Sequence, residues 1–294
     1  MNVFGNEEWK QFFHKLYQKV DSTDLFNRAA VIAFYFSFSL FPLLFFLITL
    51  AGIVLGSTNS LKNNLYGYLF QMMPSSAYVL VHKTLDEIIE NSTGGKLTLA
   101  LFITLWSASA GIDAMRSSLN AVYQVTETRS WLRTKGQSLV LTLLFILVLA
   151  FGLMAVSTGV RMFEFILRSA GAEIDSVLIL AAVQWTTILA VLLFTSEVIY
   201  NWLPCHKKFR WYWATPGSVI AIILWLILSG LFRIYLQYFN TYNRAYGSLG
   251  AVIILMLWLF LSGTAILIGG SINSVLKEMA IERISKLEEE AGKT

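Results

Sequence analysis

Six long apolar stretches divide this 294-residue chain, and each one is long enough to cross a bilayer as a helix. A helix rises about 1.5 Å per residue, so the apolar layer of a membrane requires about 20 residues. Within lipid, every backbone polar group must find its partner inside the protein, and a helix provides this. The sequence therefore predicts an all-α, polytopic membrane protein. The stretches cover residues 29–55, 97–115, 138–160, 177–203, 214–236 and 249–272.

The positions of Lys and Arg predict the orientation of these six transmembrane helices. If both termini are cytoplasmic, fifteen of the 22 basic residues fall in the termini and inner loops, and seven fall in the outer segments. Cytoplasmic segments carry the excess of positive charge in membrane proteins, so the expected topology is N-in/C-in. The net charge of +4 comes from basic residues beside the spans, which is typical of contact with anionic lipid headgroups rather than nucleic acid.

The spans predict one membrane domain over residues 1–275 and a charged, cytoplasmic helical tail over 276–294. Before the first span, residues 7–20 place several apolar side chains on one helical face. This pattern is typical of an interfacial helix on the inner leaflet, and it fits a soluble helix that caps the domain equally well. The apolar residues of this face are Trp9, Phe12, Phe13, Leu16 and Val20.

Other local patterns concern the outer segment and helix packing. Residues 57–96 carry apolar side chains at helical spacing, which predicts two short amphipathic helices folded against the outer face. In the first span, Pro42 removes a backbone hydrogen bond and predicts a kink, with a hinge as the alternative. In the last span, Ala265 and Gly269 have the small-residue spacing that membrane helices use for close packing.

Polar and charged residues gather at the predicted cytoplasmic ends of several spans. In the second span, Ser109 begins a stripe of four polar residues whose spacing places them on one helical face. Charged groups within spans are costly and usually face the bundle interior or a wet cavity. The shared depth of these groups predicts a polar vestibule that is open to the cytoplasm. Its expected lining is Arg28, Asp113, Arg116, Asn120, Glu197 and Tyr200.

A purely structural interpretation of the same residues remains open. Asp113 and Arg116 are three residues apart on a helix and can neutralise each other. Glu197 can pair with Arg28 or Arg116 to join two helices, and Arg28 can extend to the headgroups.

The sequence offers little support for an enzyme. The three histidines are scattered, and Cys205 is the only cysteine, so no metal-ligand spacing is present. No phosphate-binding loop of the Walker type and no Gly-x-Ser-x-Gly motif occurs. We therefore expect no catalytic residues, no metal site and no cofactor.

Several motifs occur in order along nearly the whole chain. The first span contains Arg28-Ala-Ala-Val-Ile-Ala-Phe-Tyr35 and then Ser39-Leu-Phe-Pro42. The second carries Ser107-Ala-Ser-Ala-Gly-Ile-Asp113, Leu119-Asn-Ala-Val-Tyr123 and Glu127-Thr-Arg129. Later motifs are Tyr200-Asn-Trp-Leu-Pro204, Pro216-Gly217, Tyr246-Gly-Ser-Leu-Gly250 and Leu257-Trp258, with Gly269 and Asn273. This series resembles the YihY/virulence factor BrkB family.

The resemblance implies a bacterial inner-membrane protein with six helices and a role in moving or handling envelope lipids. It also adds Tyr35, from the first motif, to the expected site residues. An old label of the family, ribonuclease BN, is not supported, because that activity belongs to a zinc hydrolase type whose ligand set this sequence lacks. Family members often have an acidic residue in the last span where this chain has Ser271, so a mechanism that needs that acid does not carry over unchanged.

These observations lead to three hypotheses. The first is a transporter or flippase for a lipid or solute, in which Arg116 binds the phosphate of an anionic headgroup and Asp113 holds Arg116 in place. Glu197 would then act as a counter-charge or proton carrier. The second is a non-catalytic envelope scaffold that binds partners. The third and weakest is a membrane-embedded enzyme that uses Glu197 with Tyr200 or Asp113. A homo-oligomer is compatible with each hypothesis.

Overall fold

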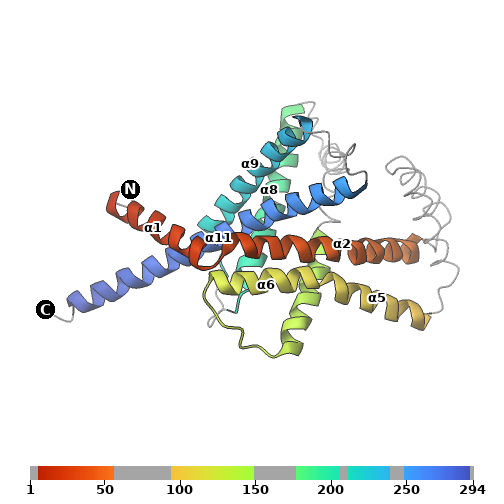
Figure 1. Ribbon diagram of the computed structural model, residues 1–294, viewed down its shortest axis with the longest axis horizontal. Helices are drawn as coiled ribbons and strands as arrows, with labels where there is room; N and C mark the ends of the chain where they lie inside the picture. Colours follow the sequence, from red (N-terminus) through yellow and green to blue (C-terminus); the bar gives the residue numbers. More distant parts are fainter. Residues whose placement is uncertain (1–5, 56–93, 149–176, 206–210, 239–247, 292–294) are drawn as a thin grey trace, which may run out of the picture. The chain divides into compact units, whose positions relative to one another are not determined.

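The computed structural model describes residues 6–55, 94–148, 177–205, 211–238 and 248–291. Throughout these ranges the regular secondary structure is α-helical, which confirms the predicted all-α class (Figure 1). The predicted outer helices of 57–96 lie almost entirely outside the described residues. The helices are α1 (Asn6–Ser22), α2 (Leu25–Leu55), α5 (Gly94–Ala108), α6 (Ala110–Val122), an unlabelled helix Trp131–Val148, α8 (Val177–Trp202), α9 (Pro216–Tyr238) and α11 (Ser248–Ala291).

Four of the described helices are long and apolar enough to cross a membrane. They correspond to the third to sixth spans expected from the sequence, and α2 adds a shorter apolar stretch, Leu25–Leu40. The second span is different, because α5 ends at Ala108 and α6 begins at Ala110 with Ser109 in a turn between them. Asp113, Arg116 and Asn120 of the polar stripe therefore lie on α6, and Ser109 lies in the turn before it. The helices that contain these four apolar stretches are Trp131–Val148, Ala181–Trp202, Pro216–Tyr238 and Val252–Glu290, and the last of them is longer than a span requires.

The chain divides into two compact units, Met1–Phe34 with Ile112–Thr294, and Tyr35–Gly111. In the second unit, the Ser39 hydroxyl donates to the Tyr35 carbonyl at 2.7 Å and accepts the Gly111 N–H at 3.0 Å. Pro42 lies inside α2, which is helical on both sides of it. The helix thus passes through the proline without a break, and the hinge stays a prediction.

In the first unit, α9 and α11 cross in close contact (Figure 1). At the crossing, Gly217 and Ala221 on α9 meet Gly269 on α11, and Ala265, one turn before Gly269, is fully buried. A Cβ atom added to Gly269 would lie 2.5 Å from the Gly217 carbonyl oxygen and 2.7 Å from the Ala221 Cβ. Small residues let helix backbones approach this closely, so the spacing noted in the sequence marks a real packing site.

Helix α11 continues well past its apolar part. Its 44 residues span about 66 Å at about 1.5 Å per residue, roughly twice the thickness of the apolar layer of a bilayer. Most residues of the predicted helical tail belong to α11, which continues to Ala291.

Helix α1 docks on this extension of α11 (Figure 1). Phe12 is buried in an apolar cluster with Ile272 and Val275, and Leu16 packs against it. Two ion pairs, Lys15–Glu282 and Lys19–Glu278, join the helices beside this cluster. The apolar face predicted for residues 7–20 is thus divided: part of it contacts α11, while Trp9, Phe13 and the neighbouring Tyr17 remain exposed.

Candidate functional site

Helix α6 is joined to the helix Trp131–Val148 by a charged network. The Asp113 carboxylate accepts hydrogen bonds from Arg116 at 2.8 Å, Ser138 at 2.5 Å and Lys135 at 2.9 Å. The Arg116 guanidinium also donates to the Ser138 hydroxyl at 2.6 Å and to the Thr134 carbonyl at 2.8 Å. The Arg116 side chain is 13% exposed, and its guanidinium group makes these hydrogen bonds within the protein. Arg116 therefore connects α6 to the helix Trp131–Val148. This geometry agrees with a structural role for Arg116, the alternative that the sequence left open.

The loop after α6 continues this network toward α8. The Glu127 carboxylate accepts two hydrogen bonds from the Arg129 guanidinium, both at 2.7 Å, and one from the Asn120 amide at 3.0 Å. Arg129 also donates to the Leu203 carbonyl at 3.0 Å, at the end of α8. The Arg129 guanidinium lowers the pKa of Glu127 to about 2, because its hydrogen bonds favour the charged carboxylate. Asn120 accepts the Cys205 N–H at 2.8 Å and so fixes the same region.

Helix α6 ends in a turn that depends on a left-handed residue. Gln124 has φ of 53° and follows the last helical turn. Its N–H donates to the Ala121 carbonyl at 3.0 Å, and the Val125 N–H donates to the Asn120 carbonyl at 2.9 Å. This is the Schellman pattern of helix ends, in which glycine is the usual left-handed residue. The turn directs the following loop to the end of α8.

A second polar network surrounds the start of α9. Thr215 caps this helix, and Pro216 occupies its first position, where proline's missing N–H costs nothing. The buried Glu197 carboxylate accepts the Thr215 N–H at 2.6 Å and the Ser218 hydroxyl at 2.5 Å. Its other oxygen accepts the Asn201 amide at 2.8 Å. Helix N-termini stabilise negative charge, so the position suits a carboxylate.

Helix α11 completes the second network. The Asn273 side-chain carbonyl accepts the Gly217 N–H at 2.8 Å, and its amide donates to the Thr215 hydroxyl at 3.0 Å. The buried Tyr200 of α8 donates its hydroxyl proton to the Ile266 carbonyl at 2.7 Å. Side chains of α8 and α11 therefore meet at the first turn of α9.

The structure groups the predicted site residues differently from the single vestibule expected. Asp113, Arg116 and Asn120 belong to the first network, whereas Glu197 and Tyr200 belong to the second. Among the described residues, Glu197 pairs with neither Arg28 nor Arg116, and its hydrogen-bond partners are the neutral groups of Asn201, Thr215 and Ser218. The Arg28 side chain instead donates to the Thr23 carbonyl at 2.7 Å, in the turn between α1 and α2. Tyr35, from the other unit, is half-exposed at 43%.

A polar cavity of about 870 Å³ lies beside the first network. Among its lining residues, Arg133 is exposed and forms no hydrogen bond or ion pair with any residue that the structure describes. Arg129 also lines the cavity, but it is held by Glu127, Gln137 and Leu203. The lining consists of Gln124, Val125, Thr126, Thr128, Arg129, Arg133, Gly136, Gln137, Val140, Asn201, Trp202, Pro204 and Cys205.

The sequence analysis missed Arg133 and Arg129 as site residues. Both lie between two spans, where a basic residue is the ordinary signal for orientation. Their spacing of four residues was the available clue that they approach one cavity, and it is a weak one.

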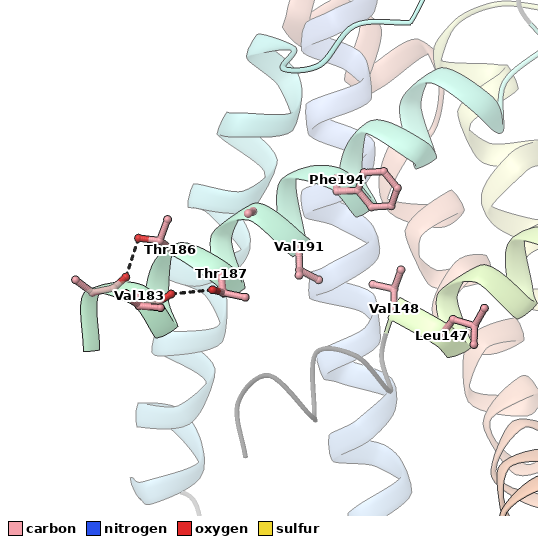
Figure 2. A pocket seen from close by; sticks show the side chains of 9 residues that line it. Leu147, Val148, Val183, Thr186, Thr187, Val191 and Phe194 are labelled. Atoms are coloured by element: carbon pink, nitrogen blue, oxygen red, sulfur yellow. Dashed lines mark hydrogen bonds between the residues drawn. The ribbon is translucent and has the colours of Figure 1, made fainter. Parts of the chain in front are cut away.

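A second, apolar groove of about 950 Å³ lies between the helix Trp131–Val148 and α8. Figure 2 shows that the two threonines in it turn their hydroxyls back onto α8. Thr186 donates to the Ala182 carbonyl at 2.7 Å and Thr187 to the Val183 carbonyl at 2.8 Å. The groove thus presents an apolar surface. It is lined by Leu147, Val148, Ala182, Val183, Thr186, Thr187, Ala190, Val191 and Phe194.

Comparison with known proteins decides the family. The family model of virulence factor BrkB matches residues 16–294. This chain belongs to the BrkB family. The match confirms the resemblance seen in the sequence motifs, and with the apolar helices it establishes a multi-pass membrane protein.

Individual proteins that resemble this BrkB-family protein over most of its length are also membrane or ribonuclease-like proteins by name. It is 33% identical over 265 residues to the ribonuclease-like protein YfkH of Bacillus subtilis, covering 90% of this chain and 94% of that protein. UPF0761 membrane proteins of Xanthomonas oryzae (strain PXO99A) and Xanthomonas campestris (strain B100) are each 28% identical over 275 residues. The matches cover 92% of this chain but 60% of each Xanthomonas protein. No solved structure matches this chain significantly. Within the described ranges, no group of three or more His, Cys, Asp or Glu side chains is placed to share a metal ion.

Proposed function

We propose that this BrkB-family protein is a non-enzymatic transporter or flippase that moves an amphipathic, anionic lipid at the cytoplasmic face of the bacterial inner membrane. The proposal includes the six spans and the N-in/C-in topology expected from the charges. The observation that carries it is a polar cavity next to an apolar groove on the same helix pair. The cavity contains Arg133, which has no partner among the residues that the structure describes.

The polar cavity and the apolar groove lie along the same face of the helix Trp131–Val148 and along the same face of α8. On the helix Trp131–Val148, Arg133 and Val140 line the cavity and Leu147 lines the groove, at spacings of seven residues. Seven residues make nearly two full turns, so these side chains share one face. On α8, Phe194 of the groove and Asn201 of the cavity are also seven residues apart.

This arrangement matches the chemistry of a lipid. From Arg133 to Leu147 the helix rises about 21 Å, which is comparable to the length of an acyl chain. Arg133 can offer its planar fork to two oxygens of a phosphate, and Trp202 lines the cavity at the end of α8, where indoles favour headgroup depth. In this proposal Arg133, rather than Arg116, contacts the headgroup. The networks of Arg116 and Glu127 hold the cavity wall in place.

Lipid scrambling in proteoliposomes tests the proposal. Wild type is expected to move a fluorescent anionic lipid, and Arg133→Ala to slow this flux about tenfold through loss of a charge-assisted hydrogen bond. The melting temperature should not change, since Arg133 has no intramolecular partner among the described residues. Arg233→Ala, which removes an exposed arginine from α9, is the matched control and should keep the full flux. If wild type moves neither anionic nor neutral lipid, with or without a proton gradient, the transport proposal is wrong.

A specific observation also favours the scaffold function as the second candidate. The α11 extension and the docked α1 continue beyond the apolar part of the last span, and α1 exposes Trp9, Phe13 and Tyr17. Exposed aromatic side chains are frequent in binding surfaces. In a scaffold, Arg133→Ala would change neither lipid movement nor stability.

A further inference from the structure

The extension of α11 beyond the span carries an apolar stripe on its outer surface. Ile281, Ile284 and Leu287 are 59%, 57% and 57% exposed. Ile284 and Leu287, together with Ala280 and Ala291, lie within about 60° of one another when each residue advances the helix by about 100°, and Ile281 borders this stripe. The docked α1 does not cover this stripe. Its partners on α11, among them Val275, Met279 and Glu282, lie on the opposite side of the helix.

The stripe has the heptad pattern of a two-stranded coiled coil. With Ile284 at position a, Leu287 falls at d, and Ala280 and Ala291 occupy the neighbouring d and a positions. Isoleucine at a with leucine at d favours parallel dimers. In this register, the α1 partners Val275, Glu278, Met279 and Glu282 fall at positions b, c or f, and Leu276, which packs against the same cluster, falls at g. The contact with α1 therefore leaves the a and d positions uncovered.

The charges beside the stripe complement those of a second copy. In the same register, Arg283 is at g and Glu288 is at e of the following heptad, which is the pair that meets across a parallel dimer. Neither side chain forms an ion pair elsewhere in the part of the chain that the structure describes. Two copies inserted in one membrane with the same topology also present their α11 extensions in parallel.

We propose that this protein forms a homodimer through a short parallel coiled coil of the α11 extensions, with Ile284 and Leu287 in its core and Arg283 paired with Glu288 of the second copy. The proposal is independent of transport. It concerns residues outside the span and requires only that both copies share one orientation. About two heptads are too short to associate alone, so the common membrane, which confines the copies, supplies the required proximity.

Cysteine cross-linking in membranes tests the contact. In a Cys205→Ser background, Ile284→Cys is expected to form a disulfide-linked dimer upon mild oxidation. Ser285→Cys is the matched control: it lies one residue away, about 100° around the helix, and should cross-link about tenfold less. Equal cross-linking at both positions, or none at Ile284→Cys, would overturn the proposal.

Charge reversal identifies the partner as a second copy. Arg283→Glu should lower the yield of the Ile284→Cys cross-link in membranes, and the double variant Arg283→Glu/Glu288→Arg should restore it. Both residues are exposed, so the melting temperature should stay constant and confirm intact folding. A cross-linking yield in membranes that Arg283→Glu leaves unchanged overturns the proposed pairing. The same holds if the double variant fails to recover the dimer, which would point to a different protein or the lipid surface as the occupant.

Discussion

The backbones of Gly217 on α9 and Gly269 on α11 are in direct contact, and neither position has room for a side chain. A Cβ atom on Gly217 would be 2.1 Å from the Gly269 carbonyl oxygen, and a Cβ atom on Gly269 would be 2.4 Å from the Tyr200 hydroxyl. The contact also brings Asn273 within reach of the Gly217 N–H. The two glycines thus position the polar network at the start of α9.

We predict that Gly269→Ala lowers the free energy of unfolding by about 1–3 kcal/mol, the usual cost of overpacking. The helices must separate to admit the methyl group, because the nearest obstacles include backbone atoms. Thermal unfolding in detergent, followed by tryptophan fluorescence, measures the effect. Gly230→Ala is the control on α9, since a Cβ atom there meets nothing within 4 Å. Alanine favours a helix over glycine, so this control should be neutral or stabilising. Equal losses in both variants would show that the crossing is not close.

Much of the fold could be predicted from the sequence because lipid imposes a simple rule. Long apolar stretches must be helical, and the described spans match this expectation closely. The break at Ser109 was missed because no proline marks it and the apolar pattern continues across it. Hydropathy reports how well a segment fits the bilayer, and it carries little information about a local turn inside the protein.

The site was harder to predict, because periodicity shows which side chains share a face but not what lies opposite that face. Asp113 and Arg116 were correctly placed together on α6, yet Lys135 and Ser138, which complete their network, come from the next helix. Pairing of Glu197 with Arg28 or Arg116 was one of the alternatives left open by the sequence, and the structure places Glu197 among neutral donors instead. The donors at the start of α9 come from local capping chemistry, which the hydropathy pattern does not show.

We predict that Glu197→Gln destabilises the protein by about 1–3 kcal/mol. The amide group of glutamine would face the Asn201 amide, so that two donors meet where one carboxylate oxygen now accepts a hydrogen bond. Glu290→Gln, on the exposed α11 extension, is the control for loss of charge alone and should change stability by less than about 0.5 kcal/mol. Unfolding midpoints in detergent provide the comparison. A Glu197→Gln variant as stable as wild type would show that the carboxylate is not needed at this helix end.

We predict that Gln124→Gly stabilises the protein by up to about 1 kcal/mol. Gln124 has φ of 53°, a conformation that glycine adopts without steric cost. The two turn hydrogen bonds use backbone groups only, so the substitution preserves them. A higher melting temperature in detergent is the expected result, and Gln124→Ala is the matched control, because alanine keeps the strain. A lower melting temperature for the glycine variant would mean that the Gln124 side chain contributes more than its backbone costs.

The Glu127–Arg129 ion pair should make stability depend on pH in a narrow acidic window. The pKa of Glu127 is about 2 in the folded protein, against an ordinary value of 4.5. As the pH falls below about 4.5, the unfolded chain binds a proton that the folded protein does not yet take up. The stabilisation from Glu127 is therefore complete above about pH 4.5 and is lost progressively toward pH 2.

The difference in melting temperature between wild type and Glu127→Gln should accordingly be constant at neutral pH and should shrink below about pH 4.5. Arg129→Gln removes the main cause of the shift and should abolish most of this dependence. If the difference between wild type and Glu127→Gln stays constant down to about pH 3, the carboxylate is not held by Arg129 in solution.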